Sequence, residues 1–136
     1  FLYIMGRNEL TEQEAAHIDQ ASAADQLTAR ELEHFGRRNG ITQSLGEEPI
    51  TIHVGQIELG PGDRLLLCTD GIHDNLTDPE ITELLSQGAR TTVAKSLVQQ
   101  ARARSQEDAT VQIRAKKDDM SAIVVTCHLL SLLERA

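Results

Sequence analysis

The sequence predicts an α+β fold, in which an antiparallel sheet carries helices on one face. Two apolar runs, at 64–68 and 122–130, have the composition and length of buried strands. Four other segments carry helix-start signals or helical periodicity. With 136 residues, the chain has the length of a single domain.

Each predicted helix has its own start or stop signal. Thr11 and Thr28 stand three residues before a glutamate, which is the spacing of a capping box. Pro79 favours the first turn of a third helix, and Gly88 favours its end. A fourth segment has an apolar stripe and arginines near its C-terminal end, where the helix dipole favours them. We expect the four helices at 11–24, 28–36, 77–88 and 92–105.

The predicted strands differ in their patterns. Residues 51–59 alternate in part, with Gly55 as a bulge or bend. Residues 64–68 are apolar on both faces, which is typical of a central strand that is covered on both sides. The run at 122–130 is strongly apolar, and the polar residues 106–117 before it predict a loop.

Composition excludes several function classes. The net charge of −8 disfavours partners such as nucleic acids and anionic membranes. No apolar run reaches the roughly 20 residues of a membrane helix, and no signal peptide is visible. Cys68 and Cys127 each lie within an apolar run, which predicts buried thiols in a reducing compartment. We therefore expect a cytoplasmic protein.

Two acidic turns stand at the ends of the predicted strands. Asp70 follows the first strand, and Asp118 and Asp119 precede the second. In antiparallel neighbours these ends meet, so Asp70 and Asp118 would converge and repel unless a cation lies between them. Oxygen ligands suit Mg²⁺ or Mn²⁺. The alternative is an ordinary turn at each position, because Asp-Gly and Asp-Asp are common at loop ends.

Four stretches, in order and at matching spacing, resemble the C-terminal half of the metal-dependent protein phosphatase family (PPM, protein phosphatase 2C type). "GDRLLLCTDGIHDNLTDPEI" resembles a strand of that family with its Asp-Gly-x-x-Asp turn and the following helix. "KKDDMSAIVV" resembles the family's final metal aspartate and strand. "RRNGITQSLG" resembles the segment beyond the flap of bacterial members, and "FLYIMGRNEL" resembles the hairpin after the family's Gly-Asp-Ser-Arg strand.

The resemblance implies a fold, a reaction and a site. The fold would be the C-terminal half of an αββα sandwich over residues 1–136, with a flap-like segment at 10–39. Asp70 and Asp118 would be metal ligands, and the supporting loop residues would be Gly71, Asp74 and Asp119. Two Mn²⁺ or Mg²⁺ ions would activate a water that attacks phosphoserine or phosphothreonine in a protein substrate.

The resemblance does not extend to the family's N-terminal motifs. Those motifs supply the remaining carboxylates, the phosphate-binding arginine and the proton-donating histidine, so no catalytic residue is expected in this sequence. We therefore expect the chain alone to be inactive and to associate with itself through exposed sheet edges. The alternative is a noncatalytic, phosphatase-like interaction or regulatory module.

Overall fold

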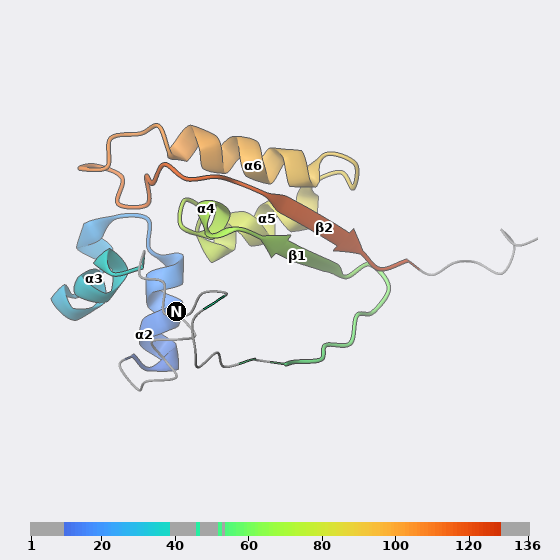
Figure 1. Cartoon of the computed structure of the whole chain (residues 1–136), viewed down its shortest axis with the longest axis horizontal. Helices are drawn as coiled ribbons and strands as arrows, with labels where there is room; N and C mark the ends of the chain where they lie inside the picture. Colours follow the sequence, from blue (N-terminus) through green and yellow to red (C-terminus); the bar gives the residue numbers. More distant parts are fainter. Residues whose placement is uncertain (1–9, 39–45, 47–51, 53, 129–136) are drawn as a thin grey trace, which may run out of the picture.

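The computed structural model describes residues 10–38, 46, 52 and 54–128 (Figure 1). Its elements, in chain order, are α2 (Glu12–Gln20), the 3₁₀ helix η1 (Ala24–Gln26), α3 (Ala29–Gly36), β1 (Arg64–Cys68), α4 (Asp70–His73), α5 (Asp78–Gln87), α6 (Val93–Arg104) and β2 (Ala122–Thr126). This content confirms the α+β class. None of the helices in this part of the chain is long and apolar enough to cross a membrane.

The sheet in the described ranges consists of β1 and β2, which run antiparallel. Arg64 pairs with Thr126, and Cys68 pairs with Ala122 at the other end of the ladder. The C-terminal end of β1 therefore lies beside the N-terminal end of β2, as the sequence predicts. β2 ends at Thr126 and is therefore shorter than the predicted strand.

Helices α4, α5 and α6 cover one face of this sheet, and α6 runs along β2 (Figure 1). The helices contribute the main core, and the sheet adds Leu66, Ala122 and Val124 to it. The fully buried core residues are Ile72, Leu76, Val93, Leu97 and Ala101. Burial of these aliphatic side chains holds the helices on the sheet. Each of the larger side chains contributes about 1.5–3 kcal/mol to the stability of the fold.

The opposite face of the sheet is exposed among the described residues. Leu67 and Ile123, which are cross-strand partners, are 54% and 62% exposed, and Val125 is exposed beside them. The prediction that 64–68 is covered on both sides is therefore wrong for this part of the chain. Cys68 and Cys127 were both expected to be buried, but Cys68 is exposed and Cys127 is partly exposed. An apolar run shows that both faces of a strand can be buried. It does not show whether another element of the chain packs on each face.

This apolar face should drive self-association of the chain. We expect light scattering over a concentration series to show dimers or larger species, since covering apolar area contributes about 25 cal/mol per Å². The paired change Leu67→Glu with Ile123→Lys should shift the chain towards monomer while preserving an attractive cross-strand pair. Val111→Glu, at an exposed loop position, is the control. A wild-type chain that stays monomeric at high concentration would contradict the prediction.

The helix starts follow the predicted signals. Thr11, Thr28 and Thr77 each accept a hydrogen bond from the backbone N–H of the glutamate three residues on, whose carboxylate in turn accepts from the threonine. Helix α2 ends at Gln20, before the predicted Ala24, because the backbone turns to an extended conformation at the next residue. The other three predicted helices match α3, α5 and α6 closely.

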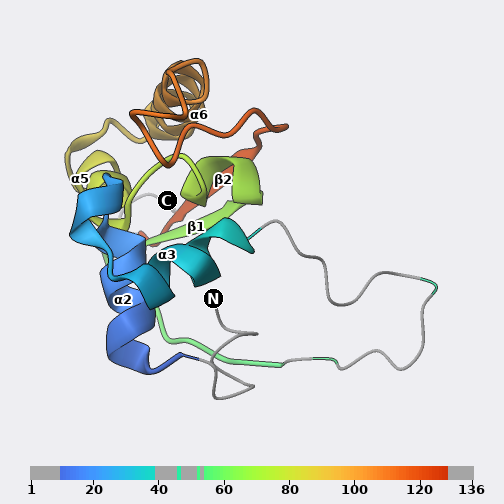
Figure 2. The same cartoon turned by 90° about the vertical axis from the view of Figure 1, so that its left-hand side faces the viewer.

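Helices α2 and α3 form a pair that packs around a second, smaller core (Figure 2). The buried residues of this core are Leu10, Ile18 and Phe35. The pair makes up most of the predicted flap-like segment, 10–39. It is joined to the rest of the structure by contacts between α2 and α5 and by Arg114, a buried residue in the loop before β2.

One local prediction fails, because residues 54–59 form no strand and are exposed. The acidic turn after β1 is a single short helix, α4. The quoted stretches at 1–9 and 39–45, and the last part of the run at 122–130, lie outside the described residues.

Candidate functional site

The end of β1 and the segment before β2 are tied together by Thr69. Its backbone N–H donates to the carbonyl of Ser121 (3.1 Å), and the N–H of Ser121 donates to the Thr69 hydroxyl (3.0 Å). The hydroxyl itself donates to the carbonyl of Asp119 (3.1 Å). These bonds continue the ladder beyond the last strand pair. They bring the residues after β1 alongside the residues before β2.

Gly71 allows the two segments to approach closely. A Cβ atom at this position would lie 2.4 Å from the carbonyl oxygen of Asp119 and 3.1 Å from Cγ of Met120. The contact of 2.4 Å with a backbone atom is too short for any side chain. The glycine after Asp70 is therefore required by the backbone that crosses it.

Three carboxylates converge on one ammonium group, that of Lys116. Its Nζ lies 2.5 Å from Oδ2 of Asp74, 3.0 Å from Oδ2 of Asp118 and 3.4 Å from Oδ2 of Asp70. Asp74 is nearly buried, whereas Asp70 and Asp118 are partly open to solvent. The structure thus brings together Asp70, Asp74 and Asp118, and places a lysine among them.

The charges in this cluster stabilise one another. Burial alone would lower the pKa of Lys116, but hydrogen bonds to Asp74 and Asp118 and the attraction of Asp70 outweigh it and raise that pKa. The hydrogen bond from Lys116 lowers the pKa of Asp118, and the backbone N–H of Asp119 adds to this effect. Lys116 is therefore protonated at neutral pH, and Asp118 is ionised.

Asn75 fixes the backbone on which Lys116 is carried. Its side-chain Nδ2 donates to the carbonyls of Gly71 and Lys116, both at 2.9 Å, and its Oδ1 accepts from the N–H of Lys116 at 3.0 Å. The side chain is fully buried between the α4 turn and the loop before β2. Asn75 therefore sets the distance between the two acidic turns.

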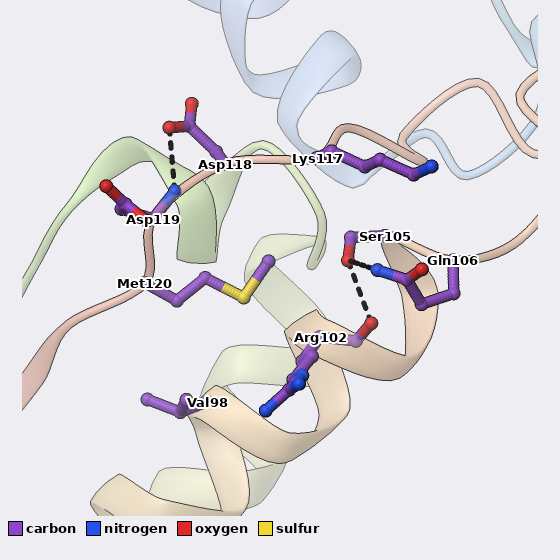
Figure 3. A pocket seen from close by; sticks show the side chains of 8 residues that line it. All are labelled: Val98, Arg102, Ser105, Gln106, Lys117, Asp118, Asp119 and Met120. Carbon is purple, nitrogen blue, oxygen red and sulfur yellow. Dashed lines mark hydrogen bonds between the residues drawn. The ribbon is translucent and has the colours of Figure 1, made fainter.

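Asp119 lies on the edge of this cluster. Its backbone N–H donates to Oδ1 of Asp118 (2.8 Å), which orients that carboxylate. Both aspartates line a cavity of about 320 Å³ beside the C-terminal end of α6 (Figure 3). The cavity is lined by Val98, Arg102, Ser105, Gln106, Lys117, Asp118, Asp119 and Met120.

The flap-like segment reaches the cluster through Arg38. Its Nε lies 4.0 Å from Oδ1 of Asp74, and its guanidinium lies over the ring of Phe35, 4.1 Å from the ring centre. Burial lowers the pKa of Arg38, and the charge of Asp74 opposes that shift. A second cavity, of about 180 Å³, lies at this contact. The α2–α3 pair therefore borders the carboxylate cluster.

The donor atoms of the cluster fit a hard divalent cation, since all of them are carboxylate oxygens. The number of these carboxylates is small. In the parts of the chain that the structure describes, no three Asp, Glu, His or Cys side chains are arranged to hold a metal ion. Two of the converging carboxylates, Asp70 and Asp118, could contribute to a metal site, with further ligands from elsewhere.

Sequence comparison identifies the family. The family model described as Stage II sporulation protein E (SpoIIE) matches residues 5–128, which is most of the chain. The chain belongs to this family. It is a family of PPM-type phosphatases, so the resemblance to metal-dependent phosphatases of the protein phosphatase 2C type is confirmed.

Curated relatives match about half of the chain. A putative protein phosphatase 2C-type of Streptococcus pyogenes serotype M6 is 33% identical over 69 residues, which are 50% of this chain and 28% of that protein. Protein phosphatase PhpP of Streptococcus pneumoniae serotype 2 is 34% identical over 70 residues, 51% of this chain and 28% of PhpP. The match thus spans little more than a quarter of these relatives. No solved structure matches the chain significantly.

The residues that support the site were not recognised from the sequence. Lys116 lies in a polar stretch that predicts a loop, and nothing in the sequence gives Asn75 or Thr69 a role. The position of Lys116 in the sequence was a signal, because a basic residue two positions before Asp118 can reach the carboxylates of the acidic turns. No local pattern marks Asn75, whose partners are four and 41 residues away.

Proposed function

We propose that this chain carries part of the active site of a Mn²⁺- or Mg²⁺-dependent protein phosphatase that acts on phosphoserine and phosphothreonine. The observation that carries the proposal is the convergence of Asp70 and Asp118 at the end of the β1–β2 ladder. The match to a phosphatase family and the names of the relatives support it. The fold would be a portion of the family's αββα sandwich.

The chain's own residues would position the reaction. Asp70 and Asp118 would hold the metal, and Gly71, Asp74 and Asp119 would keep the two turns in place. When bound, the divalent cations would supply an activated water and neutralise the phosphoryl oxygens. The cytoplasmic location stays a prediction from the sequence.

The flap-like segment, through α2 and α3, would border the bound phosphoprotein. Arg38 supports this role, because it links the segment to Asp74. The alternative of a noncatalytic module is not favoured, since the curated relatives are named as phosphatases.

The metal site can be tested by calorimetric titration of the chain with Mn²⁺. We expect weak binding by the wild type, in the high-micromolar range or above. Asp70→Asn and Asp118→Asn should each weaken it by roughly tenfold or more, since even outer-shell changes at metal sites cost about 10–100-fold. Asp25→Asn is the matched control, because Asp25 is exposed and lies far from Asp70 and Asp118 in the sequence. Equal binding by all four proteins would remove the proposed site.

A further inference from the structure

We propose that Lys116 is an internal counter-ion that a divalent cation must displace, and that it thereby sets the metal affinity of this site. The inference rests on the proposed function for the identity of the metal ligands. It goes beyond that function, because it assigns to a residue of this chain the control over metal loading.

The ammonium of Lys116 lies 3.0 and 3.4 Å from the oxygens of Asp118 and Asp70 that would bind the metal. Mg²⁺ binds oxygens at about 2.0–2.1 Å, so it would occupy the same space. Two cations at such a short separation repel each other strongly. The ammonium and the metal therefore exclude each other.

Only the side chain of Lys116 has to move. The N–H and the carbonyl of Lys116 are both held by Asn75, so its backbone is fixed. Its four-carbon stem is flexible by its chemistry, and the described contacts of the ammonium are all with the three carboxylates. Displacement would break those contacts without disturbing the fold around them.

The carboxylate of Asp74 is left buried when the ammonium of Lys116 moves. This carboxylate is 2.5 Å from Lys116, but Nε of Arg38 lies 4.0 Å away and Nδ1 of His73 lies 3.6 Å away. A buried charge without a partner would be costly. The guanidinium of Arg38 compensates part of that charge, so departure of the ammonium is feasible.

The test is a calorimetric titration with Mn²⁺ of the wild type, Lys116→Met and Lys117→Met. Methionine keeps the length of the side chain and removes the charge. We expect Lys116→Met to bind Mn²⁺ roughly tenfold more tightly, since one adjacent charge changes the ion affinity of a site by a power of ten or more. Lys117 extends away from Asp118 (Figure 3), so Lys117→Met should bind as the wild type does.

The outcomes separate this inference from the proposed function. If Asp70→Asn and Asp118→Asn weaken binding but Lys116→Met does not tighten it, the metal site stands and the counter-ion role is overturned. If none of the variants differs from the wild type, the metal site is absent and the counter-ion role falls with it. Tighter binding by Lys116→Met alone among the lysine variants supports the role.

A second measurement does not depend on the folding of a variant. The wild type is treated with an N-hydroxysuccinimide ester, and acylation of each lysine is followed by mass spectrometry with and without saturating Mn²⁺. Displacement predicts a severalfold faster acylation of Lys116 when Mn²⁺ is present, with no change at Lys117. An unchanged rate at Lys116 would overturn the inference.

Discussion

Replacing Arg114 with methionine should lower the free energy of unfolding by about 3–5 kcal/mol, because several buried carbonyls lose their donor at about 1–3 kcal/mol each. The guanidinium donates to the carbonyls of Ile18 and Ala21 in the α2 region, both at 2.5 Å, and to that of His73 at 3.1 Å. Only 2% of the residue is exposed. Methionine fills much of the same volume but donates no hydrogen bond.

The effect should be largest where Arg114 joins the α2–α3 pair to the main core. Urea unfolding followed by circular dichroism gives the total loss of stability. Amide hydrogen exchange should show faster opening of 12–36 than of 93–104 in the variant. Arg102→Met is the matched control, because Arg102 is exposed and should change stability by less than about 0.5 kcal/mol. A change of under 1 kcal/mol for Arg114→Met would mean that the guanidinium does not hold the two parts together.

Replacing Gly71 with alanine should destabilise the chain by about 1–3 kcal/mol or more, the usual range for overpacking a tight contact. The new methyl group would meet the carbonyl oxygen of Asp119 at 2.4 Å, which is backbone and cannot rotate away. The strand ends would be forced apart, and the distance between Asp70 and Asp118 would grow. We therefore expect weaker Mn²⁺ binding together with a lower midpoint in urea.

Gly36→Ala is the control for this change. No atom lies within 4 Å of a Cβ built at Gly36, which is the last residue of α3. Alanine should be neutral there or stabilise the helix by up to about 1 kcal/mol. If Gly71→Ala is as stable as Gly36→Ala and binds Mn²⁺ as the wild type does, the close approach at Gly71 does not matter.

The features that could be predicted from the sequence are those encoded by neighbouring residues. Capping boxes fix where helices begin, so the starts at Thr11 and Thr28 were correct. The convergence of Asp70 and Asp118 also followed from local patterns, because two apolar strands in an antiparallel pair must bring those positions together. The metal itself remains a prediction.

The features that could not be predicted depend on partners far apart in the chain. Arg114 contacts carbonyls more than 90 residues away, and Lys116 reaches Asp70 across 46 positions. A polar loop composition conceals both roles. The exposure of Leu67 was missed for a related reason, since a strand's sequence describes its own faces and not what packs on them.

The carboxamide of Asn75 limits the substitutions that position 75 can accept. Its NH₂ group donates to two carbonyl oxygens, and its oxygen accepts from one N–H. Aspartate has almost the same shape, yet it would place an acceptor oxygen against those two carbonyl oxygens at a fully buried position. Deamidation of Asn75 would therefore replace a hydrogen-bond donor with an acceptor while leaving the volume of the side chain unchanged. Natural selection at residue 75 should act on the hydrogen-bonding groups of the side chain rather than on its size.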